Sequence, residues 1–276
     1  MNRNLVFIFI LLLLALTSCR SPRFVHSPVA VNNPFFTKAN DSKLGMYISG
    51  GSHSGDGSND TNKVRGADVM GAYAITNHIA VTGSYHYRNE RNYYLPYRSS
   101  PFDTSLVNYK RRMWELGIGY FASLNKRNTI TANIYMGAGS ATYNIKDEGT
   151  NGSAKYSRYH NSKPFKLYFQ PGVNFMTGSV RFGTALRLNI LTYKNVMTNY
   201  SNEELAYIHL DELNNKTLLF PEFVLTTAYR FPKYPWIALE GQVSVNFNDD
   251  RYYRSRTMNA SAGLIFKPFN ILNSKK

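Results

Sequence analysis

Residues 236–248 read WIALEGQVSVNFN, and this stretch shows most clearly how the chain folds. Ile237, Leu239, Val243, Val245 and Phe247 alternate with Ala238, Glu240, Gln242, Ser244 and Asn246. Successive side chains of a β-strand point to opposite faces, so a period of two places the first set on one face and the second set on the other. The stretch therefore predicts a strand with an apolar and a polar face.

The same period of two recurs along the chain after Lys43. Nine further strands are predicted, at about 44–51, 64–75, 79–88, 111–120, 129–145, 165–175, 180–190, 217–230 and 257–267. Pro171 and Pro221 fall inside two of them, and each removes a backbone hydrogen-bond donor. We therefore expect β-bulges at these two positions.

The connections between these strands are of two kinds. Short turns are predicted near 76–78, 124–128, 176–179 and 231–235, and long polar loops at about 52–63, 89–106, 146–164, 194–216 and 248–256. Because short and long connections alternate, all the long loops emerge from one end of the sheet. An even number of strands with this asymmetry is typical of a transmembrane β-barrel, and closure removes unpaired edges.

A soluble, lipocalin-like barrel with its apolar face turned inward is the rival interpretation. Both arrangements accept the alternating pattern. The N-terminal segment, the loop asymmetry and the even strand number favour the membrane barrel.

The N-terminus indicates export. Asn2-Arg3-Asn4 is followed by an unbroken apolar run from Leu5 to Leu16, which spans roughly 18 Å as a helix at about 1.5 Å per residue. This is too short for a hydrocarbon core of about 30 Å, so residues 1–18 are interpreted as a signal peptide. Leu16-Thr17-Ser18-Cys19 resembles the lipobox of bacterial lipoproteins, in which the cysteine is lipidated and becomes the mature N-terminus. Cys19 is the only cysteine, which excludes a disulfide framework and a multi-cysteine metal site.

With this lipobox and the strand–turn–strand run Ala72–Val81, the chain over about 44–267 resembles the small outer-membrane β-barrel superfamily in its lipoprotein-anchored form. The resemblance implies an all-β, ten-stranded antiparallel transmembrane barrel with short periplasmic turns and long extracellular loops. Residues 19–43, with Pro22, Pro28 and Pro34 and no sustained periodicity, are expected to form a lipidated periplasmic tether, and 268–276 a tail. Cys19 is then expected to anchor the chain to the outer membrane from the periplasmic side.

Charged side chains on the polar face predict a network inside the barrel. A barrel of about this size is filled by its own side chains, and unpaired buried charges are costly. A narrow polar conduit is the alternative. The network is predicted to include Asp68, Arg111, Glu115, Lys166, Arg187, Glu222, Arg230 and Glu240.

One loop segment is predicted to be helical. Ser201 and Glu204 form a capping box, and Leu205, Ile208 and Leu213 follow at near-helical spacing. The helix either packs on the mouth of the barrel or docks a partner protein. A docking surface would use Glu203, Glu204, Leu205, Ile208, Asp211 and Glu212.

The net charge of +15 would ordinarily suggest nucleic acid as a partner. On the predicted topology the excess lies largely at the inner end, where cations meet anionic headgroups, so no nucleic-acid partner is expected. Arg65, Lys110 and Arg112 share the outward parity near the loop end, and we predict that they contact lipopolysaccharide phosphates.

Signals for catalysis are weak. His160-Asn161-Ser162 resembles the His-x-Ser spacing of outer-membrane lipid A deacylases, but no orienting acid accompanies it. No cofactor or metal site is expected. The prediction is a non-enzymatic scaffold or accessory subunit of a secretion or outer-membrane assembly complex. A passive channel or surface-ligand-binding barrel is the alternative, and a lipid-modifying enzyme is a further one.

Overall fold

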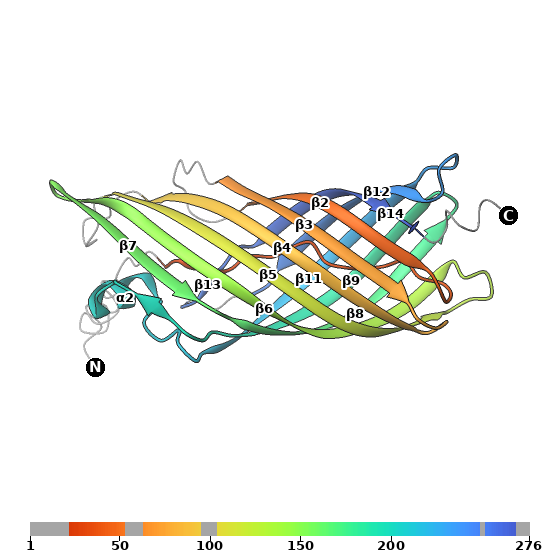
Figure 1. The fold of residues 1–276 in the computed structure, drawn as a ribbon, viewed down its shortest axis with the longest axis horizontal. Coiled ribbons are helices and arrows are strands. Elements are labelled where there is room, and N and C mark those ends of the chain that lie inside the picture. The colour runs from red at the N-terminus through yellow and green to blue at the C-terminus, as the bar shows by residue number, and fades with distance from the viewer. Residues whose placement is uncertain (1–21, 53–62, 95–103, 249–251, 269–276) are drawn as a thin grey trace, which may run out of the picture.

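The computed structural model describes residues 22–52, 63–94, 104–248 and 252–268, and within them ten strands close into one antiparallel barrel (Figure 1). Each barrel strand pairs with the next along the chain, β6 pairs with β8, and β14 returns to β2. The barrel strands are β2 (Ser42–Ser52), β3 (Lys63–Ala74), β4 (Ile79–Tyr94), β5 (Thr104–Ser123), β6 (Ile130–Asn151), β8 (Phe165–Thr177), β9 (Val180–Thr192), β11 (Thr217–Arg230), β12 (Ile237–Asn246) and β14 (Met258–Phe266).

The apolar face of these strands points outward. On β12, Glu240 and Gln242 are buried, whereas Leu239 is 49% exposed. On β5, Glu115 is buried while Trp114 and Leu116 are 51% and 63% exposed. A soluble barrel would hide these side chains from water, whereas a membrane barrel turns them to lipid. The predicted fold class is confirmed.

The strands on one side of the barrel are longer than predicted. β4, β5 and β6 include the segments 89–94, 104–106 and 146–151, which the sequence pattern predicts to be loop. β7 (Ala154–Ser162) pairs with the upper part of β6, and the short β10 (Met197–Thr198) pairs with β7. The structure thus has a sheet that extends past the barrel at the end with the long connections, here called the loop end; the opposite end is the turn end.

The prediction of bulges at Pro171 and Pro221 is wrong. Pro171 pairs with Ile134 and Pro221 with Leu188 in unbroken register. The β8–β9 register is also the same on both sides of Pro171, although Gln170 and Pro171 make no pair there. The missing donors are tolerated because each proline lies at a gap or near the end of one ladder, so no residue has to be inserted.

The most consequential difference concerns residues 22–36, which lie inside the barrel (Figure 1, red). β1 (Phe24–His26) pairs with β13 (Arg254–Ser255) at the loop end, and the Arg23 amide donates to the Ile208 carbonyl. At the turn end, the Ala39 amide donates to the Asn77 side chain. The chain therefore enters the lumen at the loop end and leaves at the turn end. Residues 22–36, which were expected to belong to a periplasmic tether, are instead buried inside the barrel and are here called the lumen segment.

The predicted helix is present as α2 (Asn202–Ile208), and its capping box is confirmed: the Glu204 amide donates to Ser201 Oγ, and the Ser201 amide donates to the Glu204 carboxylate. In the part of the chain that is described, no helix has the length and apolar character needed to cross a membrane.

Candidate functional site

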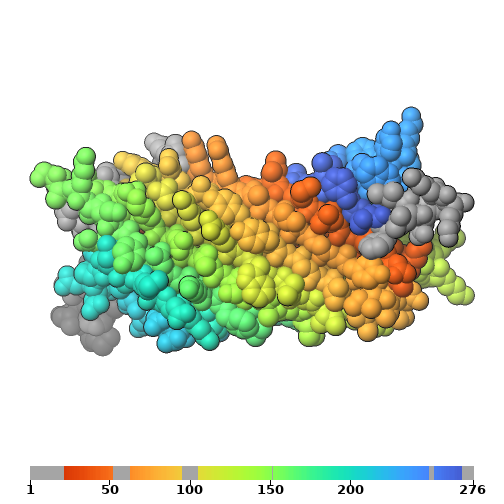
Figure 2. All heavy atoms as spheres, in the orientation of Figure 1, coloured from red at the N-terminus to blue at the C-terminus, as the bar shows by residue number. Residues whose placement is uncertain are grey.

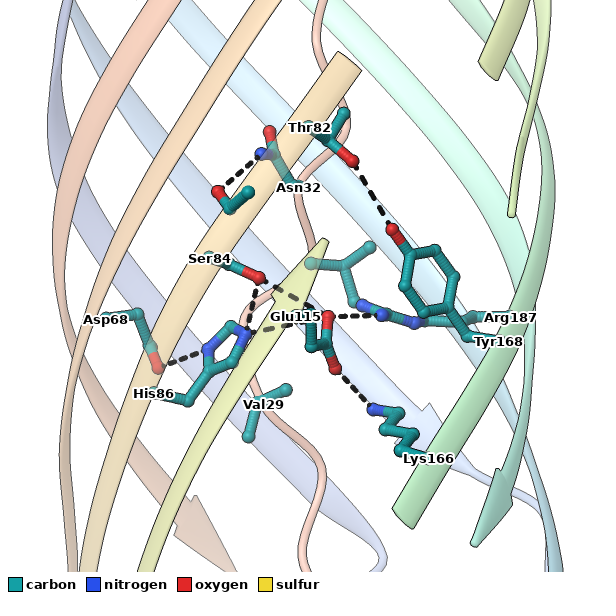
Figure 3. Close-up of polar contacts among 12 residues, drawn as sticks. Val29, Asn32, Asp68, Thr82, Ser84, His86, Glu115, Lys166, Tyr168 and Arg187 are labelled. Atoms are coloured by element: carbon teal, nitrogen blue, oxygen red, sulfur yellow. Dashed lines mark hydrogen bonds and ion pairs between the residues drawn. The ribbon is translucent and has the colours of Figure 1, made fainter. Parts of the chain in front are cut away.

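Glu115 on β5 is the centre of the charge network inside the barrel (Figure 3). One carboxylate oxygen lies 2.7 Å from Lys166 Nζ and the other 2.6 Å from Arg187 Nη2, so β8 and β9, which do not pair with β5, are joined to it. The Arg187 guanidinium also lies over the Tyr168 ring, at 4.2 Å. All these groups are buried, which makes each charge dependent on its partner.

His86 links this centre to Asp68. Its Nδ1 donates to Asp68 Oδ1 at 2.8 Å, and its Nε2 lies 3.0 Å from Ser84 Oγ and 3.8 Å from Glu115. Arg88 makes a two-bond contact with the same aspartate. Ser84, His86 and Asp68 thus lie within hydrogen-bond distance of one another in the order found in a hydrolytic triad. However, Ser84 Oγ donates to Glu115, whose negative charge would oppose an oxyanion beside the serine.

Further acids are paired along the lumen. Glu240 accepts from Lys43, Tyr47 and Gln242 near the turn end. Glu222 accepts from His26 in the middle of the barrel. Towards the loop end, Glu90 binds Arg111 and Arg256, and Asp147 binds Arg23 and Tyr200.

The structure confirms burial for every predicted network residue except Arg230, which is half-buried at the turn end and donates to the Gly178 carbonyl. The predicted residues do not form one network but lie in several separate clusters. Arg111 and Glu222 are paired with residues that were not in the predicted set. Five of the titratable groups that the prediction missed have two origins. Glu90, Asp147 and Arg256 fall in segments predicted to be loop, and Arg23 and His26 belong to the lumen segment. The alternation of buried and exposed residues continues past Arg88, but both faces are polar there, so the two faces cannot be told apart by hydrophobicity.

Beyond β1, the lumen segment is held by barrel side chains rather than by strand pairing. Gln242 both donates to the Val31 carbonyl and accepts from the Val31 amide, each at 2.8 Å. Gln170 donates to the Asn32 carbonyl and Asn174 to the Pro34 carbonyl. Because these contacts satisfy the backbone polar groups, an irregular chain can be buried here.

The lumen has little free space at the turn end. Phe35 and Phe36 line a cavity of about 20 Å³ there, together with Lys43, Arg181 and Lys267. That is about the space of one water molecule. The structure therefore shows a barrel occluded by its own chain over the described residues.

α2 is anchored to the extended sheet at the loop end. Arg158 on β7 donates to the Glu204 carboxylate through Nε and Nη2, at 3.0–3.1 Å. Ile208 is buried in an apolar cluster with Tyr200 and Leu210, and the half-buried Leu205 packs against this cluster. Of the residues predicted for partner docking, these contacts take up Glu204, Leu205 and Ile208. Glu203, Asp211 and Glu212 remain exposed, Asp211 with a hydrogen bond from Tyr252.

His160 and Ser162, the weak catalytic candidates, are both buried on β7. Within the described residues, His160 Nε2 has no hydrogen-bond partner, and burial lowers the pKa of this imidazole to about 4. The two side chains are therefore not assembled with an acid.

The predicted lipid contacts lie on the outer wall. Arg65 and Lys110 line one hollow of about 690 Å³ on β3–β6, and Arg112 lies two residues from Lys110 on the same outward face. Cys19 lies outside the described residues. Among those that are described, no group of three or more His, Cys, Asp or Glu side chains could hold a metal.

Comparisons with known proteins support the fold. No protein-family model matches the chain, and no curated protein matches it. The chain is similar to the translocator domain of the autotransporter NalP from Neisseria meningitidis, with a TM-score of 0.51 and 13% identity over 86% of this chain and 90% of that one. It also matches an outer membrane channel from Pseudomonas putida F1 (TM-score 0.39, 8% identity, 87% and 99% covered) and outer membrane phospholipase A from Escherichia coli (TM-score 0.31, 10% identity, 86% and 94% covered). The fold is that of an outer-membrane β-barrel.

Proposed function

We propose that this chain is a non-enzymatic outer-membrane barrel that acts as a scaffold or accessory subunit of a larger envelope complex, such as a secretion or barrel-assembly machine. The observation that supports this most is the occlusion of the lumen by residues 22–36. Paired charges and residues 22–36 fill the lumen over the described residues, which supports a barrel that does not conduct. Its outer wall and its extended loop end are then the surfaces left for interaction.

The proposal includes lipidation of Cys19, with one change from the sequence-based expectation. Pro22 lies at the loop end, and three residues span at most about 11 Å. We therefore propose that the lipid on Cys19 is attached on the side of the long loops, whereas the sequence-based expectation was the periplasmic side. An acyl group there would enter the outer leaflet.

A test of the scaffold role uses the exposed acids of the α2 region. The tagged full chain is purified in mild detergent beside the variant E203Q/E212Q. A stoichiometric partner that is retained by the wild type and lost with the variant supports the role. Recovery of no stoichiometric partner from the native host contradicts it.

A gated conduit is the second candidate, because the lumen segment is separable in principle: within the described residues its strand pairing is confined to β1 and β13. In planar bilayers the scaffold proposal predicts silence for the wild type. A variant without residues 24–36, checked for folding by heat-modifiable migration, is expected to conduct. Discrete steps from the wild type would favour the conduit.

A further inference from the structure

Figure 2 shows the outer wall of β3–β6 in orange to yellow-green. Near the loop end this wall has a hollow that is lined largely by cationic side chains. Its volume is about 690 Å³. Five cations contribute to its lining, and they come from four neighbouring strands: Lys63, Arg65, Arg91, Lys110 and Lys146. The strand register brings these cations together. Lys63 is paired with Arg91, and Asn89 on β4 is paired with Arg65 on one side and with Lys110 on the other.

Most of this charge is not compensated within the described residues. Lys146 pairs with Glu148 at 2.7 Å, and Arg91 donates to Asn108. Glu90 also borders the hollow, but it is committed to Arg111 and Arg256 inside the barrel. No described carboxylate lies within ion-pair distance of Lys63, Arg65 or Lys110. An outward-facing site of this kind favours an anion with several oxygens.

The hollow lies beside the surface that would face lipid. Lys110 precedes the exposed Trp114 by four residues on β5, roughly 13 Å along a strand at about 3.3 Å per residue. A second hollow of about 510 Å³ shares Lys63 and Arg65 and is otherwise lined by Gly50, Gly51, Val64, Met258 and Ala260. Cations thus border apolar surface on two sides, which is the arrangement an amphiphile requires.

We infer that this hollow binds the phosphorylated headgroup of an outer-leaflet glycolipid, the bisphosphorylated lipid A of lipopolysaccharide, with the acyl chains lying on the apolar wall below. Arg112, two residues nearer to Trp114, is placed to reach the same headgroup from the membrane side. The inference rests on the proposed outer-membrane placement but on no protein partner.

The test compares three purified forms of the full chain by native mass spectrometry and lipid titration in detergent. The site variant is K63Q/R65Q/K110Q. The matched control is K126Q/R127Q/K233Q, which removes the same charge from exposed positions at the turn end. Heat-modifiable migration verifies that each variant is folded. The probes are bisphosphoryl lipid A, monophosphoryl lipid A and phosphatidylglycerol.

The wild type and the control are expected to prefer bisphosphoryl lipid A over both other lipids. The site variant should bind it roughly a hundredfold more weakly, since it lacks three surface cations that each favour anionic lipid. Unchanged binding by the site variant, equal loss in the control, or equal binding of phosphatidylglycerol would overturn the inference. None of these outcomes depends on whether the scaffold role holds.

Discussion

At the scale of single residues, Glu115 shows how the interior depends on paired charge. Its carboxylate is buried and contacts Lys166 and Arg187, with His86 close by. E115Q would keep the shape of the side chain but leave these cations without a counter-ion. Breaking a buried ion pair typically costs about 3–5 kcal/mol. We expect the free energy of unfolding, measured by denaturant titration in detergent, to fall by about that amount.

The matched control is E148Q, because Glu148 also pairs with a lysine but at the surface. An exposed pair contributes about 0–1 kcal/mol, so this variant should be nearly neutral. Equal losses in the two variants would show that burial of the network is not what makes Glu115 important.

His160 gives the loop end a pH dependence. Burial lowers the pKa of this imidazole to about 4, against 6.5 for an ordinary histidine. As the pH falls, His160 is therefore protonated near pH 6.5 in the unfolded chain but only near pH 4 in the folded chain. Stability is fully present above pH 6.5 and is lost as the pH falls, by about 2–3 kcal/mol between pH 7 and 4.5.

This loss is measured by heating the protein at pH 7 and at pH 4.5 and using limited proteolysis to detect the unfolding of β7 and α2. The H160F variant should show a smaller difference between the two pH values. An unchanged difference would assign the pH dependence to other groups.

At the scale of elements, α2 depends on its capping box. Ser201 accepts from the Glu204 amide, and Glu204 also binds Arg158 on β7. S201A removes the cap and should destabilise the helix by about 1 kcal/mol. Hydrogen exchange of residues 202–208 should accelerate about fivefold while that of β12 stays unchanged. No change in α2 would mean that packing of Ile208 alone holds the helix.

Elements with one apolar and one polar face could be predicted from the sequence, and those without this contrast could not. All ten barrel strands were predicted because side chains such as Leu239 and Glu240 face lipid and lumen in turn. Beyond Arg88 on β4 and Ile145 on β6 both faces are polar, so the pattern predicts an end to these two strands that is too early. The lumen segment has no periodicity because it is surrounded on all sides. Its unusual density of Val, Ala and Phe between residues 25 and 36 was the available signal.

The candidate sites follow the same division. Inward parity predicted Glu115, Lys166 and Arg187, which meet in the structure. Parity alone could not show that Arg65 and Lys110 share a hollow with Lys63, Arg91 and Lys146, because that depends on the register between strands. The role of His26 at Glu222 was beyond prediction, since it depends on the path of the lumen segment.

At the scale of the whole molecule, the central feature is the direction in which residues 22–36 pass through the barrel. At the loop end, Arg23 pairs with Asp147 and its amide donates to the Ile208 carbonyl. At the turn end, the Ala39 amide donates to the Asn77 side chain. This direction fills the lumen with residues 22–36 and places Arg23 at the end of the long loops. Both the scaffold proposal and the position proposed for the lipid on Cys19 follow from it.

The most direct test is epitope labelling on intact cells. One tag is inserted between Ser21 and Pro22, and a control tag between Lys126 and Arg127 in the turn from β5 to β6. We predict that antibody labels the first tag on intact cells and the second only after the outer membrane is permeabilised. Labelling of the second tag alone on intact cells, or of the first only after permeabilisation, would contradict the passage of the chain through the lumen from the cell surface.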